Sequence, residues 1–217
     1  PIIKLRSTSA PPVLSIQDNM NWHLFLSHIW GSGQDQCATI KRQLSLLLPG
    51  VSIFLDIDDL ESIDKLEEYI EQSQVTMIFA SKGYFKSNNC LREVRCAVEK
   101  KKPLALVHDT AAYLQSYSPL EAIKNEECPD DLRPIFDSKE VIEWHRIKDF
   151  QLVGLKLLAE EVLLGCPNIY KMLLASGRLT SSPQHPLYKD IFVPGELTNQ
   201  RLGFVRPVLL YASPSNP

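Results

Sequence analysis

The feature that most constrains this chain is a series of short apolar runs separated by stretches with a helical pattern. The runs are continuous rather than alternating, which is typical of strands buried on both faces of a parallel sheet. They are Trp22–Ser27, Val51–Leu55, Val75–Ala80 and Pro103–His108, with a weak strand expected within Pro134–Ile142. Alternating strands and helices predict right-handed crossovers. The consistent fold class is an α/β flavodoxin-like sandwich, with a parallel sheet of about five strands and helices on both faces.

The expected helices have apolar residues at three- and four-residue steps, which give each helix one apolar stripe. They are expected after a turn formed by Gly31-Ser32-Gly33, in the second part of the acidic stretch 56–71, at 88–101 and at Phe150–Leu164. Pro49-Gly50 should end the first of them, because proline and glycine interrupt helices. Residues 109–132 are expected to be rich in loops.

Changes in composition along the chain predict three parts. Residues 1–20 have the composition of a tail or linker, and residues 21–165 hold the sheet and its helices. Residues 166–217 form a proline-rich extension, either packed on the domain or the start of a following unit. Within this extension, Val205–Tyr211 is apolar enough for one strand.

Charge and cysteine content narrow the class of protein. With 23 basic and 26 acidic side chains, the net charge of −3 gives no general attraction to nucleic acid or anionic membrane. We therefore expect no nucleic-acid partner and no direct membrane contact. The 5 cysteines are odd in number and lack CxxC spacing, so we expect no metal site, no disulfide framework and a cytoplasmic location.

Glu93 is a candidate site residue, a carboxylate on the helix expected at 88–101. On a helix it lies roughly 100° from the middle of the apolar stripe formed by its neighbours, at the boundary between a covered and an open face. Spacing alone favours an ordinary solvated glutamate over a residue of a cleft.

Three short stretches of sequence favour a cleft residue over a solvated glutamate. They are Phe25-Leu26-Ser27-His28, Ile53-Phe54-Leu55-Asp56-Ile57-Asp58-Asp59-Leu60-Glu61, and Ser81-Lys82-Gly83-Tyr84-Phe85 leading to Cys90-Leu91-Arg92-Glu93. Together they resemble the Toll/interleukin-1 receptor (TIR) domain, whose catalytic members split NAD, over residues 21–165. In those members the glutamate follows a serine, an aromatic pair, a second serine and a cysteine. Here these are Ser81, Tyr84-Phe85, Ser87, Cys90 and Glu93.

The resemblance implies an NAD hydrolase that releases nicotinamide and ADP-ribose, or cyclised ADP-ribose, and is active on self-association with other TIR domains. NAD is then the substrate, and no cofactor is expected. Glu93 is implied as the catalytic residue. The implied substrate-binding residues are Ser27, His28, Trp30, Asp56, Leu60, Glu61 and Cys90.

Several alternatives stay open at this point. Trp30 either stacks on a flat ring or packs under the following helix, and Cys90 is also explained as a small packing residue. Ser62-Ile63 stand where the family often has a glycine, and Ile29-Trp30 where it often has an arginine. The acidic stretch 56–71 is a poor neighbour for a pyrophosphate, so the phosphates are expected away from it, near Lys82 or Lys86. The alternative function is a non-catalytic TIR signalling and assembly module. A phosphorylation receiver domain is disfavoured, because Ser27-His28 and Ser81 stand where it needs acids.

Overall fold

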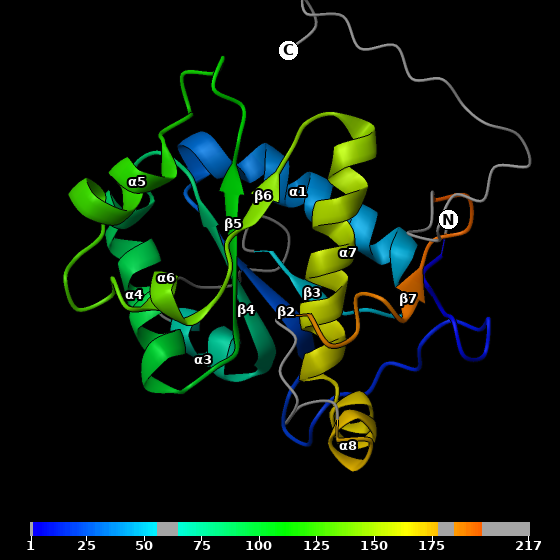
Figure 1. The fold of residues 1–217 in the computed structure, drawn as a ribbon. Helices are drawn as coiled ribbons and strands as arrows, with labels where there is room; N and C mark the ends of the chain where they lie inside the picture. The colour runs from blue at the N-terminus through cyan, green and yellow to red at the C-terminus, as the bar shows by residue number, and fades with distance from the viewer. Residues whose placement is uncertain (1, 56–64, 178–184, 197–217) are drawn as a thin grey trace, which may run out of the picture.

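The computed structural model describes residues 2–55, 65–177 and 185–196, and its centre is a five-stranded parallel sheet. Figure 1 shows the sheet between two layers of helices. From one edge to the other, the strands are β3 (Ile53–Phe54), β2 (Trp22–Ser27), β4 (Ser73–Ala80), β5 (Leu104–Asp109) and β6 (Ile142–Trp144). This order and the helical layers confirm the predicted flavodoxin-like α/β class.

The order of the strands creates a switch point between β2 and β4. The chain passes from β2 outward to the edge strand β3 and then returns to the other side of β2, where β4 pairs with it in parallel from Trp22↔Ser73 to Ser27↔Ile78. In open α/β sheets, ligands bind outside the carboxyl ends of the strands at such a point. Ser27, the last residue of β2, lies at this point.

One face of the sheet is covered by α1 (Trp30–Leu47) and α7 (Lys148–Gly165), as Figure 1 shows. Leu24 and Leu26 of β2 belong to the large apolar cluster on this face. The short helix α8 (Pro167–Ala175) follows α7 directly. Among the helices that the structure describes, none combines the length and the apolar character that a bilayer-spanning helix requires.

The opposite face is covered by smaller elements. They are α3 (Leu66–Glu71), a 3₁₀ turn η2 (Tyr84–Lys86), α4 (Asn88–Glu99), α5 (Leu120–Ala122), a π-helical turn η3 (Ile123–Glu127) and α6 (Ile135–Ser138). Phe25 of β2 faces this side and stacks on Phe54 of β3 at 5.1 Å between ring centroids, and Phe54 in turn stacks on Tyr69 of α3 at 4.4 Å. Alternate residues of β2 thus serve two separate cores, as expected for a doubly covered strand.

The first and last described segments lie together against the α1–α7 layer. β1 (Lys4–Leu5) pairs antiparallel with β7 (Ile191–Phe192), and Ile3, Leu187 and Ile191 are buried in the same cluster as the inner sides of α1 and α7. Residues 2–20, whose composition predicts a tail or linker, therefore contribute to this core, as do residues of the segment that follows 166.

The predicted turn at Gly31-Ser32-Gly33 is wrong, because α1 already begins at Trp30. Gly33 has a packing role rather than a turn role. A Cβ atom at this position would lie 3.1 Å from both His28 Cβ and Phe79 Cδ1. Glycine thus lets the first turn of α1 approach the ends of β2 and β4 closely.

Two other predictions about secondary structure need correction. No strand lies within the described stretch Pro134–Val141; α6 occupies part of it, and β6 begins only at Ile142. Helix α8 was not predicted either, because Pro167 indicates the end of α7 but equally suits the first turn of a new helix. The expected strand Val205–Tyr211 and the acidic residues 56–64 lie outside the described residues.

Candidate active site

Three polar side chains meet beneath the carboxyl ends of β2 and β4. The Ser27 hydroxyl donates a hydrogen bond to Oε2 of Glu93, and a second hydrogen bond joins Ser27 Oγ to the hydroxyl of Tyr84. All three residues are buried, with 1%, 6% and 0% exposure for Ser27, Glu93 and Tyr84. Burial of a carboxylate is costly unless it accepts hydrogen bonds, and here a hydroxyl supplies one.

The start of α4 places Glu93 in this group. Ser87 caps the helix, and its Oγ accepts a hydrogen bond of 3.4 Å from the backbone N–H of Cys90. The thiol of Cys90 contacts the carbonyl oxygen of His28 at 3.3 Å, which ties the first turn of α4 to the end of β2. Glu93 follows one turn later and so points toward Ser27.

The loop between β4 and α4 places Tyr84. Gly83 has a left-handed backbone with φ of +83°, a conformation that favours glycine, and its N–H donates to Glu127 Oε2 at 2.8 Å. Glu127 belongs to η3, and its other carboxylate oxygen lies 3.5 Å from Lys86 Nζ. The loop that carries Tyr84 is therefore anchored by a buried carboxylate from outside the sheet.

Burial raises the pKa of Tyr84 well above its ordinary value of 10.0, and the negative charges that Cys90 and Glu93 can carry act in the same direction. The phenol is therefore protonated at neutral pH. Its hydroxyl can therefore donate a hydrogen bond at neutral pH.

An open depression of about 370 Å³ lies at the switch point beside these residues. It is lined by Ile29, Gly31, Ser32, Lys82, Gln115 and Ser116, which come from the link between β2 and α1, the first turn of α1 and the loops after β4 and β5. Ser32 Oγ is 2.7 Å from Ser81 Oγ and donates to the carbonyl of Lys82 at 3.0 Å. An ammonium, a hydroxyl and an amide thus surround a space suited to a polar ligand.

The structure brings together Ser27, His28, Cys90 and Glu93 of the predicted site. His28 is 4% exposed, and its Nδ1 lies 3.3 Å from the carbonyl of Leu26. Trp30 is 59% exposed at the start of α1, between two residues that line the depression. Glu93 does not itself line the depression. Asp56, Leu60 and Glu61 lie outside the described residues.

The sequence does not predict the hydrogen bond of the Tyr84 hydroxyl, nor the place of Gln115 and Ser116 in the depression. Tyr84 was recognised only as one of an aromatic pair, and a Phe at that place would have carried the same apolar signal. Gln115 and Ser116 follow β5 in a stretch read as loop, and the only available signal is their place at the carboxyl edge of the sheet.

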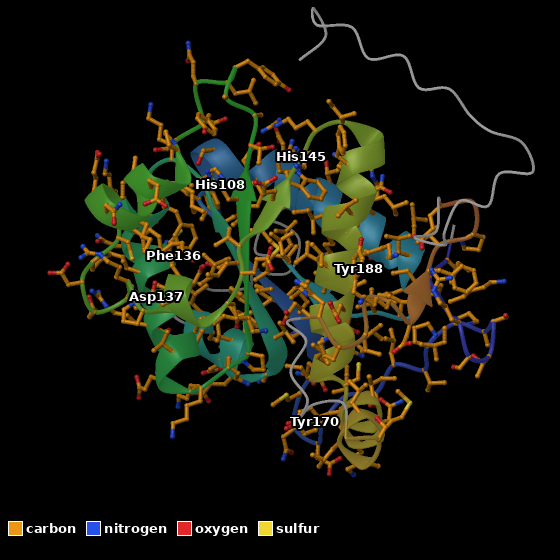
Figure 2. The ribbon with its side chains drawn as sticks, in the orientation of Figure 1. His108, Phe136, Asp137, His145, Tyr170 and Tyr188 are labelled. Carbon is orange, nitrogen blue, oxygen red and sulfur yellow. The ribbon has the colours of Figure 1, made fainter. Side chains whose placement is uncertain are left out.

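A second polar group occupies the same edge at β5 and β6. Arg146 Nη2 forms an ion pair with the buried carboxylate of Asp109, which also accepts from the N–H of Ala111 at 3.1 Å. Thr110 Oγ1 lies 3.0 Å from His145 Nδ1. Figure 2 labels His108 and His145 at this end of the sheet. Among the described residues, no group of three His, Cys, Asp or Glu side chains is arranged to hold a metal ion.

Comparison with known proteins gives structural similarity only. No protein-family model matches the chain, and no curated protein matches it in sequence. A metazoan TIR-STING receptor from C. gigas, solved in complex with 2′,3′-cGAMP, is 15% identical with a TM-score of 0.49; the match covers 70% of this chain and 42% of the receptor. This chain thus spans less than half of that receptor's length.

Two further solved structures are similar. Another structure of a TIR-STING receptor from C. gigas is 17% identical with a TM-score of 0.43, and the match covers 78% of this chain and 55% of that one. The TIR domain of the Toll-related receptor TRR-2 from Hydra magnipapillata is 18% identical with a TM-score of 0.36, over 54% of this chain and 94% of its own. At these values the similarities establish neither a family nor a function.

Proposed function

We propose that this chain is a TIR-type NAD hydrolase that releases nicotinamide and ADP-ribose, or cyclised ADP-ribose, with Glu93 as its catalytic carboxylate. One observation carries the proposal. The carboxylate of Glu93 accepts a hydrogen bond from Ser27 at the end of β2, at the switch point of a doubly wound sheet, and an open depression lined by Ser32 and Lys82 lies at the same edge of the sheet. Ligands bind at such points in folds of this class.

The chemistry of NAD cleavage explains why one carboxylate suffices. Nicotinamide leaves as a neutral ring from a pyridinium, so no acid is needed to protonate it. Breaking its bond to ribose places positive charge on the sugar, and an anionic side chain against the ribose stabilises that charge. In this proposal Glu93 orients the ribose hydroxyls and stabilises the developing cation.

The depression supports this assignment by its size and its polar groups. Its volume of about 370 Å³ lies in the ordinary range of ligand pockets. Lys82 supplies a positive charge for a pyrophosphate, and Ser32 supplies a hydroxyl. The exposed Trp30 at its border offers a flat face for a ring. We propose that NAD lies along these residues, with its ribose toward Ser27 and Glu93.

A second function, a non-catalytic TIR signalling and assembly module, is favoured by a different observation. Glu93 is 6% exposed, does not line the depression and already accepts a hydrogen bond from Ser27. A glutamate that serves only to join α4 to β2 would look the same. In that case the surface around the depression would bind other TIR domains rather than NAD.

Nicotinamide release separates the two functions. Purified wild-type protein, Glu93→Gln and Glu99→Gln are incubated with NAD, and free nicotinamide is measured by chromatography. Glu99 is an exposed glutamate at the end of the same helix and provides the matched control. The hydrolase predicts release by wild type and Glu99→Gln, and a loss of about 10²-fold or more in folded Glu93→Gln. No release by wild type at any protein concentration supports the assembly module instead.

A further inference from the structure

We propose that Tyr84 is a positioning residue, whose hydroxyl orients Ser27 and, through Ser27, the carboxylate of Glu93. The role in catalysis rests on the function proposed above. The hydrogen-bond chain itself does not, because it concerns only atoms of this protein.

The direction of the chain follows from counting protons. A serine hydroxyl has a single proton to donate. Ser27 uses that proton on Oε2 of Glu93, so in its contact with Tyr84 it can only accept. Tyr84 must therefore donate, and the order is Tyr84 hydroxyl to Ser27 hydroxyl to Glu93 carboxylate. Hydrogen bonds in such a row polarise and strengthen one another in a buried setting.

The hydroxyl of Tyr84 has no packing purpose that Phe would not serve. The ring packs edge-on against Phe85, at 5.0 Å between centroids, and belongs to the apolar cluster that contains Ile78 and Val94. Burial of a hydroxyl in such a cluster costs free energy unless the hydroxyl is hydrogen-bonded. The bond to Ser27 offsets this cost, so the polar group is explained by the chain that ends on Glu93.

The backbone around Tyr84 fixes where its hydroxyl points. Gly83 is anchored to Glu127, and the N–H of Tyr84 donates to the carbonyl of Ser81 at 3.0 Å. The same loop contributes Lys82 to the depression and joins Ser81 to Ser32. One short, anchored loop therefore sets both the wall of the depression and the donor for Ser27.

Loss of the Tyr84 hydroxyl should let the Ser27 side chain change its orientation, while the other side chains of the site stay in place. In Tyr84→Phe the Ser27 oxygen no longer accepts a hydrogen bond from position 84. The Ser27 hydroxyl can then rotate, and its hydrogen bond to Glu93 weakens. If Glu93 acts on NAD, kcat falls by about 3- to 10-fold, the worth of one ordinary hydrogen bond, while KM changes little. The fall in kcat without a rise in KM separates misorientation of Glu93 from a damaged binding surface.

The deciding experiment follows the Glu93 carboxyl directly. Protein labelled with ¹³C in its glutamate side chains is titrated by NMR, and the Glu93 signal is assigned as the one lost in Glu93→Gln. Hydrogen bonds to a carboxylate favour its charged form. The titration midpoint of Glu93 should therefore rise by about 0.3–1 pH unit in Tyr84→Phe and by more in Ser27→Ala. In the control Tyr188→Phe, which removes a distant tyrosine hydroxyl, it should stay unchanged.

Replacement of Tyr84 by 3-fluorotyrosine keeps the shape of the side chain and guards against a Tyr84→Phe variant that does not fold. Fluorination makes the phenol a stronger donor, so the midpoint of Glu93 should fall. Midpoints equal to wild type in folded Tyr84→Phe or in the fluorotyrosine protein would overturn the positioning role. Absence of nicotinamide release by wild type would remove the proposed hydrolase and leave the NMR result to decide on Tyr84 by itself.

Discussion

The hydroxyl of Ser27, the last residue of β2, donates a hydrogen bond to the carboxylate of Glu93 in the second turn of α4. The bond joins two residues that lie 66 positions apart in the sequence. It joins β2 to a helix on the face of the sheet opposite α1, and β2 lies beside β4 at the switch point of the described sheet. This hydrogen bond therefore contributes both to the attachment of α4 to β2 and to the position of Glu93 in the candidate site.

The close approach of α1 to the sheet predicts opposite effects at two neighbouring glycines. Gly33→Ala places a Cβ 3.1 Å from His28 and Phe79 and should lower the free energy of unfolding by about 1–3 kcal/mol. Gly31→Ala meets nothing within 4 Å and should be neutral or stabilise by up to about 1 kcal/mol, because alanine favours helix. Urea unfolding of both variants measures this, and equal effects would contradict the packing role of Gly33.

The stack of Phe25, Phe54 and Tyr69 predicts a large cost for its middle member. Phe54 is fully buried between the other two rings, so Phe54→Ala should destabilise by about 3–5 kcal/mol. Leu46→Ala, on the exposed side of α1, should cost about 0.5 kcal/mol or less. A thermal or urea melt of each variant compares them. A loss below about 1 kcal/mol for Phe54→Ala would mean that the edge of the sheet is placed wrongly.

Glu160 predicts an unusual dependence of stability on pH. This fully buried carboxylate of α7 accepts from the N–H groups of Leu187 and Tyr188 at 2.6 and 2.8 Å and contacts His185 Nδ1 at 2.9 Å. Figure 2 shows Tyr188 beside α7. Burial raises the pKa of Glu160 above its ordinary 4.5 despite these donors. The folded state therefore binds this proton more tightly than the unfolded state.

A raised pKa in the folded state gives stability that is fully present below pH 4.5 and is lost as the pH rises through the folded value. Glu160→Gln keeps an acceptor for the two N–H groups and cannot titrate. The stability of wild type relative to Glu160→Gln should therefore decrease as the pH rises above 4.5 and through the raised pKa of Glu160 in the folded state. Urea melts of both proteins at several pH values measure this difference in stability. A change in the charge of His185 or Glu140, which lie 3.5 Å apart, would contribute to the same measurement. A difference that grows with pH would refute the prediction.

Self-association predicts how NAD cleavage depends on protein concentration. If the proposed hydrolase is competent only in an assembly, the competent fraction sets the apparent rate. Nicotinamide release should then rise faster than linearly with protein concentration, and macromolecular crowding should increase it at a fixed concentration. Light scattering on the same samples reports the assembly state. A strictly linear rate from a monomer would reject the shared site and leave the role of Glu93 untouched.

The sheet could be predicted from the sequence because its strands are continuous apolar runs. β2 has the predicted bounds, and β4 and β5 differ from them by no more than two residues. β6 was misplaced, because a three-residue edge strand carries little periodic signal. No local sequence pattern predicted the pairing of β1 with β7, since it depends on two short segments near opposite ends of the described fold.

The candidate site was predictable only in part. The spacing of Ser81, Tyr84, Ser87, Cys90 and Glu93 pointed to the loop and helix that meet the end of β2, and Ser27 was expected from its place at the end of a strand. The hydrogen bonds among Ser27, Tyr84 and Glu93 could not be predicted. Helical periodicity placed Glu93 at the boundary between a covered and an open face of its helix, whereas the structure buries it. Which side chain points at which is decided by tertiary packing, and the loop anchor Glu127 lies outside every motif.

The two outer strands of the sheet are its shortest, with 2 residues in β3 and 3 in β6 against 8 in the central β4. An outer strand of that length presents few unpaired backbone groups, so it is a poor template for an added strand from another molecule. The sheet is thereby protected from edge-to-edge aggregation. Ordered assembly of this domain would have to use the side chains of helices and loops, whose contacts can be made and broken without disturbing the backbone ladder.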